Sequence, residues 1–519
     1  MPPEDSQRAS CAWLDDQSSD NKLLVFAVAL AFAAVVIFHL ASAAAGYPFF
    51  RDQHLGAAIE YAKSGIDLMH PVIPGFNATG TGTPQEIPIW QALASIPLRV
   101  SAWWGWANVV SLVCFLPACW VAWRLGDYWL GARGGLWVLL AFILQHLVAY
   151  TAGVASVDGL ALSLAALSLY AMVRFVDAGG WFFGLSAIVW GSLSATSKLP
   201  LFMMAGISAA GYAVWRADRR WGRIGGLTGI GMICSGLFFA WNAACDSVLR
   251  GALFPHVELS LGGNPAMMRW YFGDLAYRLN PANYIKGGWA ALNVLFGSFA
   301  LVGVCAAGIF SRVKRPALCM LAGGIFTVVV FTHLVLVHRH YYVLFSIPVA
   351  LFVGGGLLLI EEQFQRRYRA SRWFFVPLAA GCLGLATIQG LIGMEVVLNY
   401  DPYPRQMAAE IQNRVRPDER ILIEGGGWGG QALMLAERDG LSVWAADLLA
   451  RPDDIQKLKA LGFTKLVMIR ESPLLWALKK TNPGSAALKR ESFSDETLRQ
   501  LDSWPTLRQT DDILIKQIP

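Results

Sequence analysis

Two acidic side chains in polar segments are the first candidates for chemistry. The segment FRDQHLGAAIEYAKSG contains Asp52, followed by Gln53, soon after a long apolar stretch, and the segment EIPIWQ contains Glu86. A carboxylate within hydrogen-bond reach of a hydroxyl can accept its proton as a general base. Each acid also has an ordinary explanation. Asp52 is then an interfacial acid paired with Arg51, and Glu86 belongs to a loop that enters a surface helix.

Further ionisable residues lie beside or within apolar stretches. Asp158 opens the segment DGLALSLAALSLY, and Lys198 lies in SATSKLP between two apolar stretches. Ionisable residues within membrane segments are costly and by default indicate function. Helix capping for Asp158 and a side chain that reaches the interface for Lys198 are the alternatives. A third group combines cations with aromatic rings: His338, Arg339, His340, Tyr341 and Tyr342.

The composition decides the class of protein that must position these residues. Of 519 residues, 55% are hydrophobic and 15% charged, whereas soluble domains have about 45–50% and about 25%. This excludes a disordered chain and a nucleic-acid-binding module and favours a polytopic membrane protein. The net charge of +6, from 42 basic and 36 acidic residues, then orients loops across the membrane. None of the eight cysteines has paired CxxC spacing, so they predict neither a disulfide framework nor a metal site.

Apolar stretches long enough to span a bilayer, which takes about 20 residues in a helix, recur along residues 23–397. The sequence predicts about eleven of them. They lie near 23–45, 104–123, 134–150, 155–173, 181–197, 199–215, 224–243, 288–310, 317–337, 341–360 and 373–397.

The basic residues predict the orientation. Short clusters fall in every second loop, at 124–133, 174–180, 216–223, 311–316 and 361–372. Because such clusters stay in the cytoplasm, residues 1–22 are predicted to be a cytoplasmic tail. An odd number of spans then puts residues 398–519 outside. The cationic run at 338–340 falls on the outer side against this trend, which indicates an anionic ligand there.

Three outer segments are too long to be plain turns: 46–103, 244–287 and 398–519. The end of the first and the residues just after it contain Trp90, Trp103, Trp104 and Trp106, which is typical of short helices at a membrane interface. The last alternates helical stretches with short β-like runs such as RILIEG and KLVMIR. The predicted fold class is therefore a polytopic α-helical membrane protein with a C-terminal extracytoplasmic α/β domain.

Several of these motifs, in this order, resemble the GT-C superfamily of polytopic glycosyltransferases. The resemblance is strongest to the bacterial branch related to protein O-mannosyltransferases and the lipid A aminoarabinose transferase. The matching segments are FRDQHLGAAIEYAKSG, EIPIWQ, VDG at Asp158, TSK at Lys198, RHYYVLFSIP, and the glycine-rich ILIEGGGWGGQALMLAERDG. Two features differ: Gln53 stands where a second acid often follows the first, and the Lys-Pro-Pro motif of the aminoarabinose branch is absent.

The resemblance implies a function and roles for these residues. The protein would transfer a sugar from a polyprenyl-phosphate donor to an extracytoplasmic acceptor at the outer face of a bacterial inner membrane. The transfer would invert the configuration of the anomeric carbon. Asp52 would be the general base. Glu86 would orient the acceptor or the base, or share a divalent cation with Asp52.

The resemblance also implies a donor site. Lys198 and Arg339 would bind the donor phosphate together, and His338, His340, Tyr341 and Tyr342 would assist them. Asp158 and Gln53 would line the substrate cavity. The competing hypothesis is a transporter or flippase of lipid-linked glycans, which predicts inverted repeats and charges at mid-membrane. No repeat is visible in the sequence.

Overall fold

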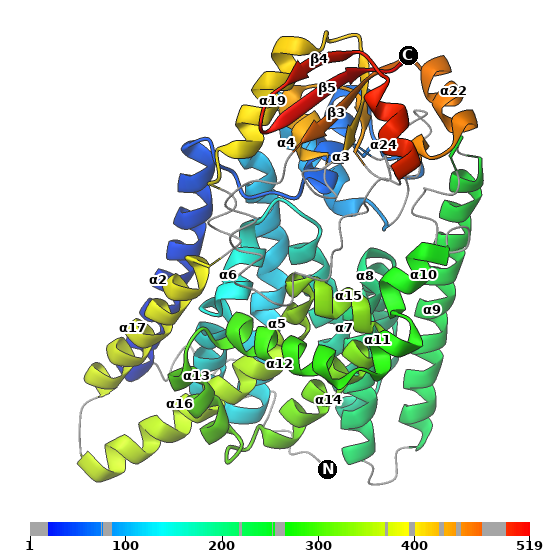
Figure 1. The fold of residues 1–519 in the computed structure, drawn as a ribbon. Coiled ribbons are helices and arrows are strands. Elements are labelled where there is room, and N and C mark those ends of the chain that lie inside the picture. The colour runs from blue at the N-terminus through cyan, green and yellow to red at the C-terminus, as the bar shows by residue number, and fades with distance from the viewer. Residues whose placement is uncertain are drawn as a thin grey trace.

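The structure is a computed structural model in which a long helical body is capped at one end by a small sheet (Figure 1). It describes residues 19–73, 75, 86–216, 221–251, 253–254, 265–368, 372–393, 400–424, 430–442, 448–469 and 495–519. Most of the predicted cytoplasmic tail and residues 425–429 of the glycine-rich loop lie outside these ranges.

The helical body begins with the long apolar helix α2 and ends with α17. Its helices are α2 (Ser19–Ala44), α3 (Asp52–Ser64), α4 (Ile89–Val100), α5 (Gly105–Ile143), α6 (His146–Gly153), α7 (Asp158–Ala178), α8 (Trp181–Trp215), α9 (Trp221–Arg250), α10 (Pro265–Phe272), α11 (Leu275–Leu279), α12 (Pro281–Phe296), α13 (Phe299–Gly308), α14 (Lys314–Val330), α15 (Thr332–Val337), the 3₁₀ helix η1 (Arg339–Phe345), α16 (Ser346–Tyr368) and α17 (Arg372–Leu391).

Helix α8 reverses direction at Lys198, whose backbone is not helical (φ −154°, ψ 92°). Both ends of α8 lie near Asp177, close to the end of α7. Trp181 follows that end in the chain, and Arg216, just after α8, pairs with Asp177 through Nε at 3.1 Å. Pro200 also favours a break here, because a proline inside a helix has no amide hydrogen to donate and its ring clashes with the carbonyl four residues earlier. Lys198 therefore occupies the turn between the two apolar stretches, as the sequence predicts.

Helix α5 has a comparable break at Gly131 (φ 80°, ψ 175°). Only glycine adopts such a positive φ without strain. Beyond the break the chain packs tightly on itself, since a Cβ on Gly126 would come within 2.9 Å of the Gly135 Cα. The predicted loop 124–133 is thus mostly helical, and the reversal is confined to one residue.

The basic loops gather at one end of the body. Arg174 lies over the Tyr128 ring, Arg315 lies over the Trp215 ring, and both Tyr128 and Tyr212 donate to Asp177. These residues come from the predicted cytoplasmic loops or from helix ends beside them. The structure therefore groups the loops that the charge pattern assigns to a common side.

A buried ion pair ties three helices together at this end. Glu361 of α16 is 1% exposed and accepts hydrogen bonds from the Arg133 guanidinium and from Trp137 Nε1, the latter at 2.9 Å. Arg133 also donates to Asn21 of α2 at 3.0 Å. Every oxygen of the Glu361 carboxylate thus has a donor.

Removal of this carboxylate should destabilise the protein. We expect Glu361→Ala to cost about 3–5 kcal/mol, because it leaves the Arg133 charge buried without its partner. Arg416→Ala removes an exposed pair with Asp418 and should cost at most about 1 kcal/mol. Thermal unfolding in detergent, followed by tryptophan fluorescence, tests this. Equal midpoints for the two variants would contradict the structural role of Glu361.

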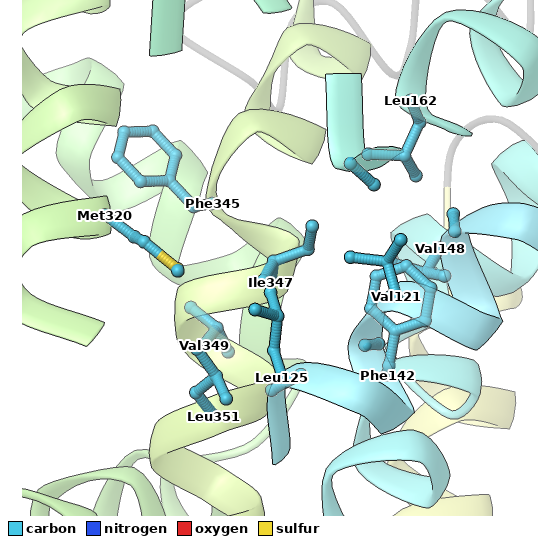
Figure 2. Packing of buried hydrophobic residues seen from close by; sticks show 14 of the residues in the cluster. Val121, Leu125, Phe142, Val148, Leu162, Met320, Phe345, Ile347, Val349 and Leu351 are labelled. Carbon is cyan, nitrogen blue, oxygen red and sulfur yellow. The ribbon is translucent and has the colours of Figure 1, made fainter. Parts of the chain in front are cut away.

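Apolar side chains from α5, α6, α7, α14, η1 and α16 fill the centre of the body (Figure 2). In this view Val121, Phe142 and Leu162 lie near Ile347, on the segment that runs from η1 into α16. Glycines let helices approach closely here: a Cβ on Gly308 would come within 2.0 Å of the Phe352 carbonyl oxygen. This packing fixes η1, which carries the cationic run, against the rest of the body.

The predicted span 288–310 was wrong as one continuous helix. Helices α12 and α13 meet at 90°, and Gly297 adopts a left-handed conformation (φ 62°). Ser298 then caps α13 by accepting a hydrogen bond from the Leu301 amide. The Gly-Ser pair combines a common helix stop with a common helix start, a signal that the apolar composition obscured.

The apolar helices of the body are of membrane-spanning type. Within the described ranges, six helices are long and apolar enough to cross a membrane, or seven if α12 and α13 are counted as one bent span. The reversals in α5 and α8 place two predicted segments in each of these elements. The number of about eleven crossings therefore stays a prediction.

The C-terminal domain is an α/β unit, as the sequence predicts. Its strands form one sheet in the order β2-β1-β3-β5-β4, parallel among β2, β1 and β3 and antiparallel from β3 to β4. The elements are α19 (Tyr403–Arg414), β1 (Arg420–Glu424), α20 (Gln431–Ala436), β2 (Gly440–Leu441), α22 (Pro452–Ala460), β3 (Phe463–Ile469), α24 (Asp495–Asp502), β4 (Thr506–Gln509) and β5 (Ile513–Gln517).

Both earlier outer segments attach to this domain. Gly75 forms a parallel bridge with Leu441, and its carbonyl accepts a hydrogen bond from Ser442 N at 2.9 Å. Phe254, which follows α9, is fully buried among the domain's apolar residues. Helix α20 also contacts α3. The domain therefore lies over the end of the body where Asp52 begins α3 (Figure 1).

Candidate active site

The site begins where the chain leaves α2 and pairs with the chain that enters α7. Ala155 N donates to the Phe49 carbonyl at 2.8 Å, and Arg51 N donates to the Ala155 carbonyl at 3.1 Å. Asn108 of α5 donates to both Phe49 and Gly153 carbonyls at 2.6 Å. This pairing brings the start of α3, with Asp52, next to the start of α7, with Asp158.

Asp158 is the most enclosed acid of the site. Its side chain is 5% exposed, and its two oxygens face Arg51 Nε at 2.9 Å and Lys198 Nζ at 3.4 Å. Ser156 Oγ donates to the same carboxylate at 3.0 Å. Arg51 thus forms its ion pair with Asp158, whereas the ordinary explanation of Asp52 placed Arg51 beside Asp52.

Glu86 reaches the same cation from a different segment. The amide of Ile87 donates to the Thr196 carbonyl at 3.0 Å, which fixes Glu86 beside the turn of α8. Its Oε2 lies 3.5 Å from Lys198 Nζ, and its Oε1 lies 2.6 Å from His54 Nε2. Burial alone would raise the pKa of Glu86, but the charge of Lys198 and the contact with His54 lower the pKa below its usual value.

Lys198 is consequently the centre of a charge cluster. It contacts two carboxylates, and its Nζ lies 5.4 Å from the centre of the Tyr341 ring. Tyr271 of α10 is close enough to interact electrostatically with Lys198, Glu86 and Tyr341, and burial raises the pKa of its hydroxyl. Two cationic side chains, Arg51 and Lys198, balance two carboxylates, Glu86 and Asp158, so the cluster needs no further ion for neutrality.

Asp52 differs from the other acids. It is half-buried at the start of α3, where the helix dipole favours a negative charge. Its Oδ2 is buried and has no hydrogen-bond partner in the part of the chain that the structure describes. Burial raises the pKa of this carboxyl, against the opposing effects of the Gln53 amide and of the neighbouring His54 and Arg51 side chains. Gln53 follows it and is also half-buried.

The residues of the cationic run have two kinds of surroundings. Some make packing contacts that hold η1 in place, and others line a cavity. Tyr342 is 1% exposed and donates to the Gly287 carbonyl of α12 at 3.0 Å. The His338 ring packs on Trp270. Arg339 and His340 line a cavity of about 270 Å³ between α6, α12, η1 and α17. Its other lining residues include His146, Tyr150, Asn293 and Gln389.

The cavity and the charge cluster adjoin each other through η1. The His340 ring packs on Tyr341 with centroids 4.5 Å apart, and the Tyr341 ring faces Lys198. His340 also interacts electrostatically with Asp158 and Arg51. Lys198 therefore contacts η1 at Tyr341, whereas Arg339 and His340 of η1 line the cavity. Lys198 contacts the carboxylates and Arg339 borders the cavity.

The residues do not fit a divalent cation shared by Asp52 and Glu86. In the described ranges, no three side chains of the His, Cys, Asp and Glu types converge as metal ligands. Glu86 already has a cation and an imidazole as partners. No step of the reaction is therefore assigned to a metal.

Sequence reasoning missed two residues of this cluster. His54 stands two positions after Asp52, and Tyr271 comes from the second outer segment. Sequence reasoning also did not predict the ion pair of Arg51 with Asp158. The histidine in RDQH could have been predicted as a site residue, since it lies in the first turn of α3 together with Asp52. Nothing in the local sequence of α10 predicts that Tyr271 lies beside Lys198.

No protein-family model matches the sequence, and no curated protein matches it. Solved structures do resemble the fold. ArnT from Cupriavidus metallidurans in the apo state has a TM-score of 0.59 and 14% identity over 97% of this chain and 99% of that chain. ArnT bound to undecaprenyl phosphate has a TM-score of 0.58 and 14% identity over 95% of this chain and 98% of that chain.

A more distant likeness, with a TM-score of 0.45, is to the Archaeoglobus fulgidus oligosaccharyltransferase, with 12% identity over 86% of this chain and 68% of that chain. The two ArnT structures match almost the whole chain, including the C-terminal domain. The chain therefore has the fold of the two ArnT structures over nearly its whole length, and the predicted resemblance is confirmed at the level of the fold.

Proposed function

We propose that this protein is a membrane glycosyltransferase that moves a sugar from a polyprenyl-phosphate donor to an acceptor hydroxyl outside the cytoplasm. The main support for the proposal is the environment of the Asp52 carboxylate. Its buried Oδ2 has no hydrogen-bond partner among the described residues, beside a cluster in which the other carboxylates are balanced. Support for the donor class comes from the fold, because ArnT was crystallised with undecaprenyl phosphate.

In the proposed reaction Asp52 accepts the proton of the acceptor hydroxyl. The hydroxyl oxygen then forms a bond to the anomeric carbon, and the bond from that carbon to the phosphate oxygen breaks. The electron pair leaves with the polyprenyl phosphate. A single direct displacement of this kind inverts the anomeric configuration.

The charge distribution favours the η1 cavity for the leaving phosphate. Arg339 is a strong phosphate ligand because its guanidinium can donate two parallel hydrogen bonds, and it borders the cavity with His340. Lys198 lies within 3.5 Å of two carboxylates, so it contributes mainly by holding Glu86 and Asp158 in place. His338 and Tyr342 are assigned to packing around η1.

Purified protein in detergent, supplied with a labelled polyprenyl-phosphate sugar and envelope lipid, tests the function. We expect release of polyprenyl phosphate in step with label entering the acceptor. Label that stays on the donor, in the presence of bound donor, would contradict the proposal.

The cavity assignment predicts a binding defect for Arg339→Ala. Loss of the guanidinium removes an attraction that exists before the reaction begins, so the donor KM should rise by about tenfold or more with a smaller fall in kcat. Lys286→Ala changes an exposed cation of α12, the helix that also supplies Asn293 to the cavity, and should leave the KM unchanged. Equal donor KM values in both variants would contradict the assignment of the donor phosphate to this cavity.

A further inference from the structure

His54 is a buried imidazole with only one of its two nitrogens in use. The residue is 9% exposed, and its Nε2 lies 2.6 Å from Glu86 Oε1. Its ring meets Trp90 edge to face, with centroids 6.3 Å apart. Trp90 is itself fixed, because its Nε1 donates to Ser111 Oγ at 3.0 Å. The ring of His54 is therefore held in one orientation.

The contact with Glu86 decides which nitrogen carries the proton. A lone pair facing a carboxylate oxygen at this distance would be repelled, so Nε2 must carry hydrogen. In the neutral ring, Nδ1 is then an acceptor only. This atom is buried and has no hydrogen-bond partner within the described ranges.

Buried polar atoms without a partner are rare in native structures and point to a group that binds there. The start of α3 offers two such atoms, Asp52 Oδ2 and His54 Nδ1. Both are acceptors when Asp52 is ionised, so they suit hydroxyl groups and repel phosphate oxygens. The phosphate-binding cations lie elsewhere, at η1.

Resting on the proposed function, we propose that His54 is a substrate-contacting residue whose Nδ1 accepts a hydrogen bond from a sugar hydroxyl. This hydroxyl is distinct from the one that Asp52 deprotonates. Glu86 acts through His54, since its carboxylate keeps the proton on Nε2 and leaves Nδ1 open. His54 and Glu86 thus select substrates that have a hydroxyl next to the reacting group, on either the donor sugar or the acceptor.

Two substitutions separate this role from a structural one. In His54→Gln, the amide nitrogen stands close to the position of Nε2 and keeps the contact with Glu86, but the Nδ1 acceptor is lost. In His54→Asn, the amide oxygen stands close to the position of Nδ1 and keeps the acceptor, but the contact with Glu86 is lost.

Steady-state transfer by the full-length protein, with a polyprenyl-phosphate-linked hexose as donor and envelope lipid extract as acceptor, gives the readout. We expect His54→Gln to raise one KM by about tenfold, the usual cost of an unpaired buried hydrogen-bonding group, with a smaller change in kcat. His54→Asn should recover much of that loss. A rise in the donor KM identifies the donor sugar as the source of the hydroxyl, and a rise in the acceptor KM identifies the acceptor.

A purely structural His54 predicts the reverse order, because His54→Asn breaks the Glu86 contact. That order, or unchanged KM values in His54→Gln, would overturn the inference while leaving the transferase intact. Absence of transfer by the wild-type protein would remove the proposed function, and the role of His54 with it. Thermal midpoints equal to that of the wild type show that both variants are folded.

Discussion

Asp52→Asn should abolish most sugar transfer, lowering kcat by about 10²–10⁴-fold, the contribution of a positioned general base. The amide has nearly the same shape as the carboxylate but cannot accept the proton. The buried Oδ2 has no hydrogen-bond partner within the described ranges, so the substitution should leave folding unaffected. Transfer and thermal unfolding are measured on the same preparation.

A matched control lies on the same helix. Glu60→Gln also changes a carboxylate of α3 to an amide, but Glu60 pairs with exposed Lys63 at 2.9 Å, away from the charge cluster, and should retain wild-type activity. The pH dependence adds a second test. Burial raises the pKa of Asp52, so activity should be lost on acidification at a higher pH than an ordinary aspartate would cause. Full activity in Asp52→Asn would reject the general-base role.

Lys198→Met should damage both stability and activity. The substitution keeps much of the side-chain volume but removes the charge between Glu86 and Asp158. These carboxylates then face each other in an enclosed site, where Lys198 is 10% exposed and Asp158 is 5% exposed. Removing one partner of a buried ion pair costs about 3–5 kcal/mol. We also expect transfer to fall about 100-fold or more, because Glu86 contacts His54, which in turn interacts electrostatically with Asp52.

A second substitution should partly reverse the loss of stability. Glu86→Gln in the Lys198→Met background removes one of the two opposed charges, so the double variant should be more stable than Lys198→Met alone. Thermal midpoints of the wild type, both single variants and the double variant form the required cycle. Strict additivity of the two effects would show that Lys198 and Glu86 do not interact and would contradict the cluster.

The sequence predicts much of this architecture because each feature rests on local chemistry. Lys198 before a proline predicts a hinge, and the basic loops predict a common end of the body. The short β-like runs RILIEG and KLVMIR predict β1 and β3 of the C-terminal sheet. The strand β4 was not predicted, because its residues are mostly exposed and carry no alternating apolar pattern.

The pairing of side chains was less predictable because it depends on contacts between distant segments. Sequence reasoning selected Asp52, Glu86 and Lys198 as residues of one site, and in the structure Glu86 Oε2 lies 3.5 Å from Lys198 Nζ. It did not predict that Arg51 turns to Asp158. That choice follows from the backbone pairing of Phe49 with Ala155, about 100 residues apart, which no local pattern encodes.

The two carboxylates closest to Lys198 illustrate the same limit. A local pattern cannot show that one of them, Asp158, comes from the start of α7 and the other from the segment before α4. The resemblance assigns Lys198 to the donor phosphate together with Arg339, and this assignment stays a prediction. Once both carboxylates are in place, the cavity beside Arg339 is the better-supported phosphate site.

The central claim, that the protein breaks the bond between sugar and lipid phosphate, is tested most directly in proteoliposomes. These carry a labelled polyprenyl-phosphate sugar and an acceptor lipid, with either the wild type or Asp52→Asn. We expect one polyprenyl phosphate to be released for each sugar that enters the acceptor in the wild type, and almost none in the variant. Movement of intact donor across the bilayer without release of polyprenyl phosphate would contradict it and identify a flippase.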